Sequence, residues 1–189
     1  LDYKSITSTD IAWKICPVLN SPGRMGNALE ALNFFIKNDY QVAGLINSNE
    51  DRKKLGTDGY NLFVSEVDEN KKLYGGKINF FYSDKISRGV LSLTASKLCE
   101  VSGCPVIVAY ADQAEVVGSI RSRNDIHLVE FLDGAKEILA EYGGHKNAAG
   151  FRFNPSRLGD FKRYLTAKSA EIELNLNDDV EIDAEIPVD

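Results

Sequence analysis

The sequence contains few of the residues on which metal centres and disulfide frameworks depend. Only two histidines and three cysteines occur among the 189 residues. The cysteines have no CxxC spacing, and their odd number argues against a disulfide framework or a zinc site. A two-metal phosphoesterase needs several aspartates and histidines at close spacing, which two histidines eighteen residues apart do not supply. We therefore expect this chain to bind no metal ion or other cofactor.

Long hydrophobic runs and nucleotide-binding signatures are absent as well. No run of about 18 apolar residues exists, which excludes a membrane helix, and no charged start precedes an apolar core, which excludes a signal peptide. Neither a G-x-x-x-x-G-K-[ST] loop nor a GxSxG motif occurs. The unpaired cysteines favour a cytoplasmic protein. Because the first residue is Leu1 and residues 1–30 read like the end of a preceding unit, we expect a segment of a longer protein.

Negative charge is concentrated at one end of the chain. The formal net charge is −6, from 28 acidic and 22 basic residues. Residues 171–189 contain eight acids and no base, which leaves 20 acids against 22 bases in residues 1–170. The overall acidity therefore does not exclude nucleic acid as a partner of the main body.

Apolar periodicity predicts an α/β protein. Helices are predicted at 27–37, 40–73, 89–102, 127–141 and 154–169, and strands at 78–82, 105–110, 115–121, 148–153 and 180–186. The prolines and glycines of residues 17–26 predict a loop. We expect a mixed sheet of about five strands flanked by helices, preceded by a helical connecting segment.

The stretch 142–151 combines three glycines, two alanines and one of the two histidines. Glycine allows positive φ and close approach of a ligand or another backbone, so the pattern predicts a crowded turn that presents His145. This histidine could donate to a phosphate, bind a metal or serve a structural role. The glycine frame argues against a purely structural role, because glycines cost entropy that such a position need not spend.

Two further stretches could bind an anion. In residues 118–123, Arg121 and Arg123 stand with two serines where a strand opens into a loop, and arginine matches phosphate oxygens in bidentate fashion. In residues 20–26, Arg24 lies between glycines before a predicted helix. Each stretch taken alone is more typical of a solvated surface turn.

Five stretches resemble, in order and spacing, signatures of the DHH phosphoesterase superfamily. Residues 143–151 resemble the GGHxxAAG signature of its DHH-associated C-terminal domain, and residues 118–122 resemble the GSxRS element of RecJ-type single-strand-specific exonucleases. Residues 17–26 are similar to the P-x-[IL]-N-x-x-G-R-[LM] stretch where the RecJ catalytic domain passes into its connecting helix. Residues 49–53 and 89–98 resemble the N-x-x-R and GVxGIxASRL stretches.

The resemblance implies that residues 1–75 form the end of a catalytic domain with a helical connector, and residues 76–189 an α/β substrate-binding domain. Mn²⁺ or Mg²⁺ would be held by the DHH domain before this chain, which alone would be inactive. Single-stranded nucleic acid, DNA rather than RNA, would be the partner. The residues that the resemblance places at the substrate cleft are Arg24, Ser119, Arg121, Ser122, Gly143, Gly144 and His145.

Within that set, the resemblance assigns a terminal or scissile phosphate to Arg121 and Ser122, and an assisting catalytic role to His145 through stabilisation of phosphate charge. One departure is visible, because Ser87-Arg88 stands where the family usually has a histidine.

Three alternatives to the exonuclease interpretation stay open. One is a phosphodiesterase of the same superfamily that acts on oligonucleotides or cyclic dinucleotides. Another is a catalytically inactive RecJ-like replication scaffold, which the missing histidine favours. The C-terminal domain of an alanyl-tRNA synthetase shares the glycine-histidine motif but fits residues 17–26 poorly.

Overall fold

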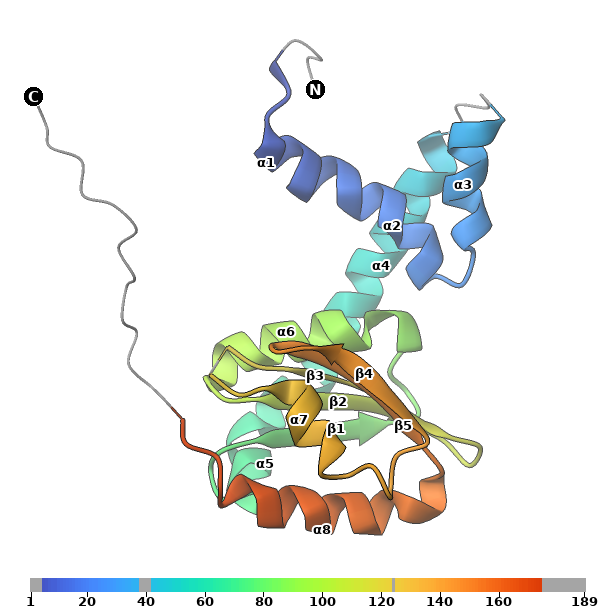
Figure 1. Ribbon diagram of the computed structural model, residues 1–189. Coiled ribbons are helices and arrows are strands. Elements are labelled where there is room, and N and C mark those ends of the chain that lie inside the picture. Colours follow the sequence, from blue (N-terminus) through green and yellow to red (C-terminus); the bar gives the residue numbers. More distant parts are fainter. Residues whose placement is uncertain (1–4, 38–41, 124, 175–189) are drawn as a thin grey trace, which may run out of the picture.

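The computed structural model describes residues 5–37, 42–123 and 125–174. A helical segment projects from an α/β body, and the long helix α4 joins the two (Figure 1). In order, the helical segment contains α1 (Ser8–Asp10), a π-helical turn η2 (Ile11–Ile15), α2 (Cys16–Arg24), α3 (Ala28–Ile36) and α4 (Val42–Phe63). The short helices η3 (Val64–Glu66) and α5 (Val67–Leu73) lead into the body.

The body is built on five strands: β1 (Asn79–Ser83), β2 (Val106–Ala111), β3 (Val116–Arg121), β4 (Glu141–His145) and β5 (Ala148–Phe153). Their order across the sheet is β1-β2-β3-β5-β4, with β1 parallel to β2 and the other pairs antiparallel. The predicted α/β class with a mixed five-stranded sheet is therefore confirmed. The strand predicted at 180–186 lies outside the described residues, and the division of the chain at residue 75 stays a prediction.

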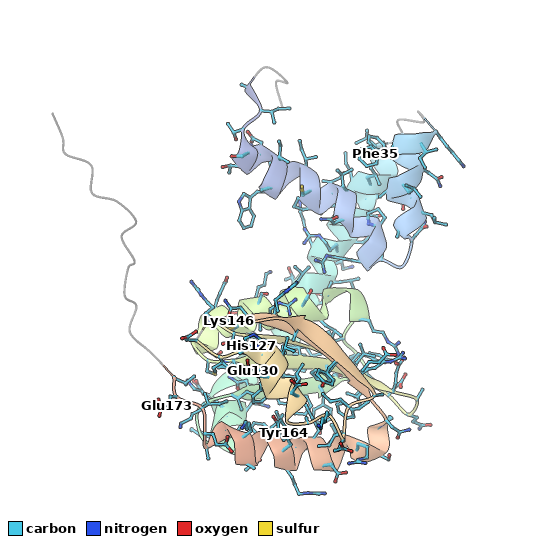
Figure 2. All side chains as sticks on the ribbon, in the orientation of Figure 1. Phe35, His127, Glu130, Lys146, Tyr164 and Glu173 are labelled. Carbon is cyan, nitrogen blue, oxygen red and sulfur yellow. The ribbon has the colours of Figure 1, made fainter. Side chains whose placement is uncertain are left out.

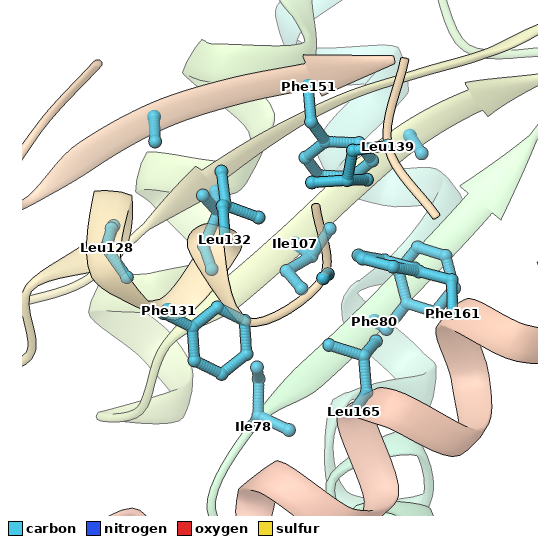
Figure 3. Close-up of a cluster of buried hydrophobic side chains, with 14 of the residues drawn as sticks. Ile78, Phe80, Ile107, Leu128, Phe131, Leu132, Leu139, Phe151, Phe161 and Leu165 are labelled. Atoms are coloured by element: carbon cyan, nitrogen blue, oxygen red, sulfur yellow. The ribbon is translucent and has the colours of Figure 1, made fainter. Parts of the chain in front are cut away.

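Helices cover both faces of the sheet. The remaining elements are η4 (Arg88–Val90), α6 (Leu91–Ser102), α7 (Leu128–Asp133), η5 (Pro155–Arg157) and α8 (Leu158–Ser169). One core lies between the sheet and α7 and α8, where Phe131, Phe161 and Leu165 pack against strand residues such as Phe80 (Figure 3). The second core lies on the opposite face, where Leu98 of α6 packs with β2 and the end of α4.

Residues 16–24 form helix α2, so the predicted loop there is wrong. Pro17 lies in the first turn of α2, a position that proline tolerates, directly after the π-helical turn η2. Pro22 lies inside the helix and cannot donate to the Val18 carbonyl, but the Ser21 Oγ donates to that carbonyl at 2.7 Å instead. A buried serine thus replaces the lost backbone donor.

The helix predicted at 127–141 is too long. Helix α7 ends at Asp133, and residues 134–138 form turns before β4 begins at Glu141. Ala135 and Leu139 still face the core, which explains why their spacing looked helical. The Ala140 N–H donates to the Arg152 carbonyl at 2.9 Å, so sheet pairing with β5 replaces helical bonding.

Candidate nucleic-acid interface

Four of the residues predicted to bind substrate, Ser119, Arg121, Gly143 and His145, share the face of the sheet that α6 partly covers, whereas Gly144 is paired with Ala149 of the opposite face. Residues paired directly across antiparallel strands project from the same face. The register therefore aligns two rows across β3, β5 and β4, which are Ser119–Gly150–Gly143 and Arg121–Ala148–His145. On β2, Arg121 is paired with Val106, which packs in the core beneath α6. On β5, the two rows contain only the small residues Ala148 and Gly150, which leave space above the strand.

Arg121 is held at the end of β3 by neutral acceptors. Its Nη1 donates to the Ser119 Oγ and to the Ile120 carbonyl, each at 2.8 Å. Partial burial lowers the pKa of Arg121, and the nearby positive charge of Arg24 lowers that pKa further. An arginine nevertheless stays protonated. The guanidinium group therefore lies beside a second cation at a half-buried position.

Arg24 is the last residue of α2 and bridges the helical segment to the body. Its Nη1 donates to the Ser92 Oγ at 3.2 Å and to the Gly89 carbonyl at 3.4 Å. The backbones also touch, because a Cβ at Gly89 would lie 1.9 Å from the Arg24 carbonyl oxygen. Only glycine allows this approach, which fixes the end of α2 against η4.

Arg52 completes an arginine cluster with Arg24 and Arg121. Its Nε donates to Oδ1 of the buried Asn49 at 3.1 Å. Burial lowers the pKa of Arg52, and the charge of Arg24 lowers that pKa further. The prediction of site residues omitted Arg52, although the N-x-x-R spacing, which places both side chains on one face of a helix, was the available signal.

No member of the arginine cluster forms an ion pair with a carboxylate among the residues that the structure describes. Glu50 pairs instead with Lys53 at 2.7 Å. Arg24 and Arg52 also line a cavity of about 640 Å³ between α2 and α4. Glu50 lines the same cavity, but the grouped cations form no ion pair with it, and such a group favours an anionic ligand.

The two serines of the predicted site are buried, at 8 % exposure for Ser119 and 6 % for Ser122. Ser119 accepts the bond from Arg121 and donates to the Ala149 carbonyl at 3.4 Å. The Ser122 backbone N–H donates to the Asn147 carbonyl at 3.2 Å. Both serines therefore hold the site together, and their direct contact with a substrate stays a prediction.

Gly143, Gly144 and His145 lie in strand β4 of a hairpin, whose tip presents His145 at the surface. Gly144 adopts φ 151°, and a Cβ there would lie 2.3 Å from the Ala148 carbonyl oxygen, whereas a Cβ at Gly143 would meet nothing within 4 Å. The tip is tied to the start of α7, because the Leu128 N–H donates to the Lys146 carbonyl at 2.8 Å. Figure 2 shows Lys146 near His127, the residue before α7.

Arg88, one of the two residues at which the sequence departs from the resemblance, is bound to the β2–β3 hairpin. Its Nη1 donates to Glu115 Oε1 at 2.5 Å, and its guanidinium lies 4.3 Å from the centre of the Tyr110 ring. The hydrogen bond to Glu115 raises the pKa of Arg88. Arg88 therefore contributes to holding η4 and is not a member of the arginine cluster.

Metal ligands do not gather in the described part of the chain. Across residues 5–37, 42–123 and 125–174, no three side chains of histidine, cysteine, aspartate or glutamate are placed to hold a metal ion. The same ranges contain no helix with the length and apolar content needed to cross a membrane.

These features agree with the comparison to known proteins. The DHHA1 domain family matches residues 59–171, and the chain belongs to this family. The single-stranded-DNA-specific exonuclease RecJ of Thermus thermophilus is 28% identical over 168 residues, which cover 86% of this chain and 24% of that protein. The RecJ of Haemophilus influenzae is 25% identical over 184 residues, which cover 90% of this chain and 32% of that protein.

A solved structure shows the same fold. The crystal structure of Thermus thermophilus RecJ in complex with Mg²⁺ superimposes with a TM-score of 0.76 at 28% identity, over 87% of this chain and 26% of that one. The chain therefore spans between about a quarter and a third of these RecJ proteins. The predicted resemblance to the RecJ type of DHH phosphoesterase is confirmed.

Proposed function

We propose that this chain forms the substrate-binding part of a RecJ-like single-stranded-DNA-specific exonuclease. A preceding DHH domain supplies Mn²⁺ or Mg²⁺ for phosphodiester hydrolysis, and this chain holds the strand. The observation that supports this most strongly is the arginine cluster of Arg24, Arg52 and Arg121, which has only neutral hydrogen-bond acceptors. Guanidinium groups bind phosphate oxygens through paired charge-assisted hydrogen bonds.

In this proposal, Arg121 and His145, which lie in one row across the sheet, have different roles. Arg121, positioned by Ser119, binds a phosphate of the strand. His145, on the same face of the sheet, donates to the phosphate at which the bond breaks and stabilises its developing charge. The small residues of β5 between them let the strand lie close to the sheet.

Two further assignments complete the proposal. We assign DNA as the preferred strand because the similar RecJ proteins are named single-stranded-DNA-specific exonucleases. The protein works in the cytoplasm, where its three free cysteines stay reduced.

Arg121→Ala tests the proposal. We expect the variant to bind 5′-phosphorylated single-stranded DNA more weakly by about 1–3 kcal/mol, as for a lost charge-assisted hydrogen bond. The control is Arg163→Ala, because Arg163 is an exposed arginine on α8 that pairs with Asp160. Fluorescence anisotropy with labelled strands measures both. Equal affinity of the two variants would remove Arg121 from the site.

A further inference from the structure

We propose that the groove between α4 and α6 is a second phosphate-binding subsite, which holds the single strand beyond the nucleotides bound by the arginine cluster. This proposal rests on the proposed function, since it assumes that the ligand is a polynucleotide. It assigns a binding role to Lys97, which none of the sequence motifs singled out as a site residue.

The groove has a volume of about 480 Å³ and runs between two helices that cross next to Arg24. Its polar lining comes from both helices, with Arg52, Lys53 and Thr57 on α4 and Ser96, Lys97 and Glu100 on α6. Thr57 and Ser96 donate to carbonyls of their own helices, to Lys53 at 3.1 Å and to Ser92 at 3.0 Å. These short side chains leave the groove open.

Positive charge predominates in this groove. Three cations face one carboxylate, that of Glu100. Lys97 is exposed and has no ion pair with any residue that the structure describes, whereas Lys53 is partly neutralised by Glu50 at 2.7 Å. Lys97 is therefore the cation in the groove most available to a ligand.

The groove is continuous with the candidate site. Arg52 lines both the groove and the cavity that contains Arg24, and Leu93 of α6 lines both as well. A strand that leaves Arg121 and Arg24 can pass Arg52 and reach Lys97 along one surface. Cations spread along a groove suit the repeated phosphates of a polymer, whereas a small anion needs donors that converge on one point.

Lys97→Ala tests the subsite through strand length and salt. One lost phosphate contact should weaken binding of a long single strand about eightfold at ~50 mM salt and about fourfold at ~150 mM, and should reduce the slope of log K against log salt by about 0.7. The proposal places Lys97 beyond the nucleotides held by the arginine cluster, so the affinity of a 5′-phosphorylated dinucleotide should not change.

Two further variants separate charge from structure. Glu100→Gln removes the one carboxylate of the groove and should strengthen binding of the long strand, a result that partial unfolding does not produce. Lys97→Arg should keep the wild-type affinity. The control is Lys162→Ala. Lys162 belongs to α8, which lies across the sheet from α6 (Figure 1), and its Nζ donates to the Tyr82 hydroxyl at 2.7 Å.

The outcomes distinguish the subsite from the proposed function. The subsite is overturned if Lys97→Ala binds the long strand as well as Lys162→Ala does, or if it weakens the dinucleotide by the same factor. In either case Arg121→Ala still tests the primary site, because its effect should appear with both ligands. If Arg121→Ala changes neither, the proposed function fails and the subsite fails with it.

Discussion

The arginine cluster brings like charges together at half-buried positions. Arg52 and Arg121 each have a pKa lowered first by burial and then by the charge of Arg24, so the protein alone holds these groups at an electrostatic cost. A bound phosphate relieves that cost because it places negative charge among the guanidinium groups. In the proposed complex, the residues whose charges repel one another in the free protein would bind the strand.

At the residue scale, His145 should matter for catalysis more than for binding. In a full-length protein that includes the DHH domain, His145→Ala should lower kcat about 10²-fold, the effect of removing one donor to a developing oxyanion. Strand affinity, measured separately without the catalytic metal, should change little because the arginines remain. His127→Ala is the matched control, since His127 precedes α7. A comparable loss of kcat in both variants would show that the effect is not specific to His145.

At the scale of elements, the two adjacent glycines of the β4–β5 hairpin should differ in how well they tolerate a side chain. Gly144→Ala should lower the free energy of unfolding by about 1–3 kcal/mol, because alanine is strained at positive φ and its Cβ would overlap the Ala148 carbonyl. Gly143→Ala should change stability by less than about 0.5 kcal/mol, because its Cβ would project into open space. Urea unfolding compares the two, and equal losses would contradict the geometry.

The sequence predicted those elements whose local signals agree with their packing. Strand β2 was recognisable from its apolar run. Helix α6 was recognisable from Gly103, which adopts the left-handed conformation that ends the helix. Strand β4 was missed because Gly143 and Gly144 carry no β propensity, and only pairing with β5 makes them a strand. Helix α2 was missed because Ser21 offsets the effect of Pro22, a tertiary detail that propensity does not express.

The candidate site was predictable only where a local motif marks a residue. Arg24, Ser119, Arg121 and His145 lie in recognisable motifs, and the sheet register brings the last three to one face. The burial of Ser119 depends on the assembled sheet, which a motif does not contain. The N-x-x-R stretch marks Arg52, but its position beside Arg24 depends on the approach of α4 to α2, which that stretch does not contain.

For the molecule as a whole, binding and hydrolysis should be separable. The 189-residue chain incubated with Mn²⁺ and a labelled single strand should bind the strand without cleaving it, because its described residues contain no group of metal ligands. Gel analysis of the strand over time measures this, with the full-length protein as the positive control. Metal-dependent cleavage by the chain alone would place catalytic residues here.

The contact between Gly89 and Arg24 has a consequence for protein engineering. The helical segment and η4 of the body meet at this point through backbone atoms, with no side chain at position 89 to match. Contacts of this kind do not depend on complementary side-chain shapes. Chimeras that join the first part of one relative to the sheet of another should therefore keep Arg24 in register, provided that glycine is retained at position 89.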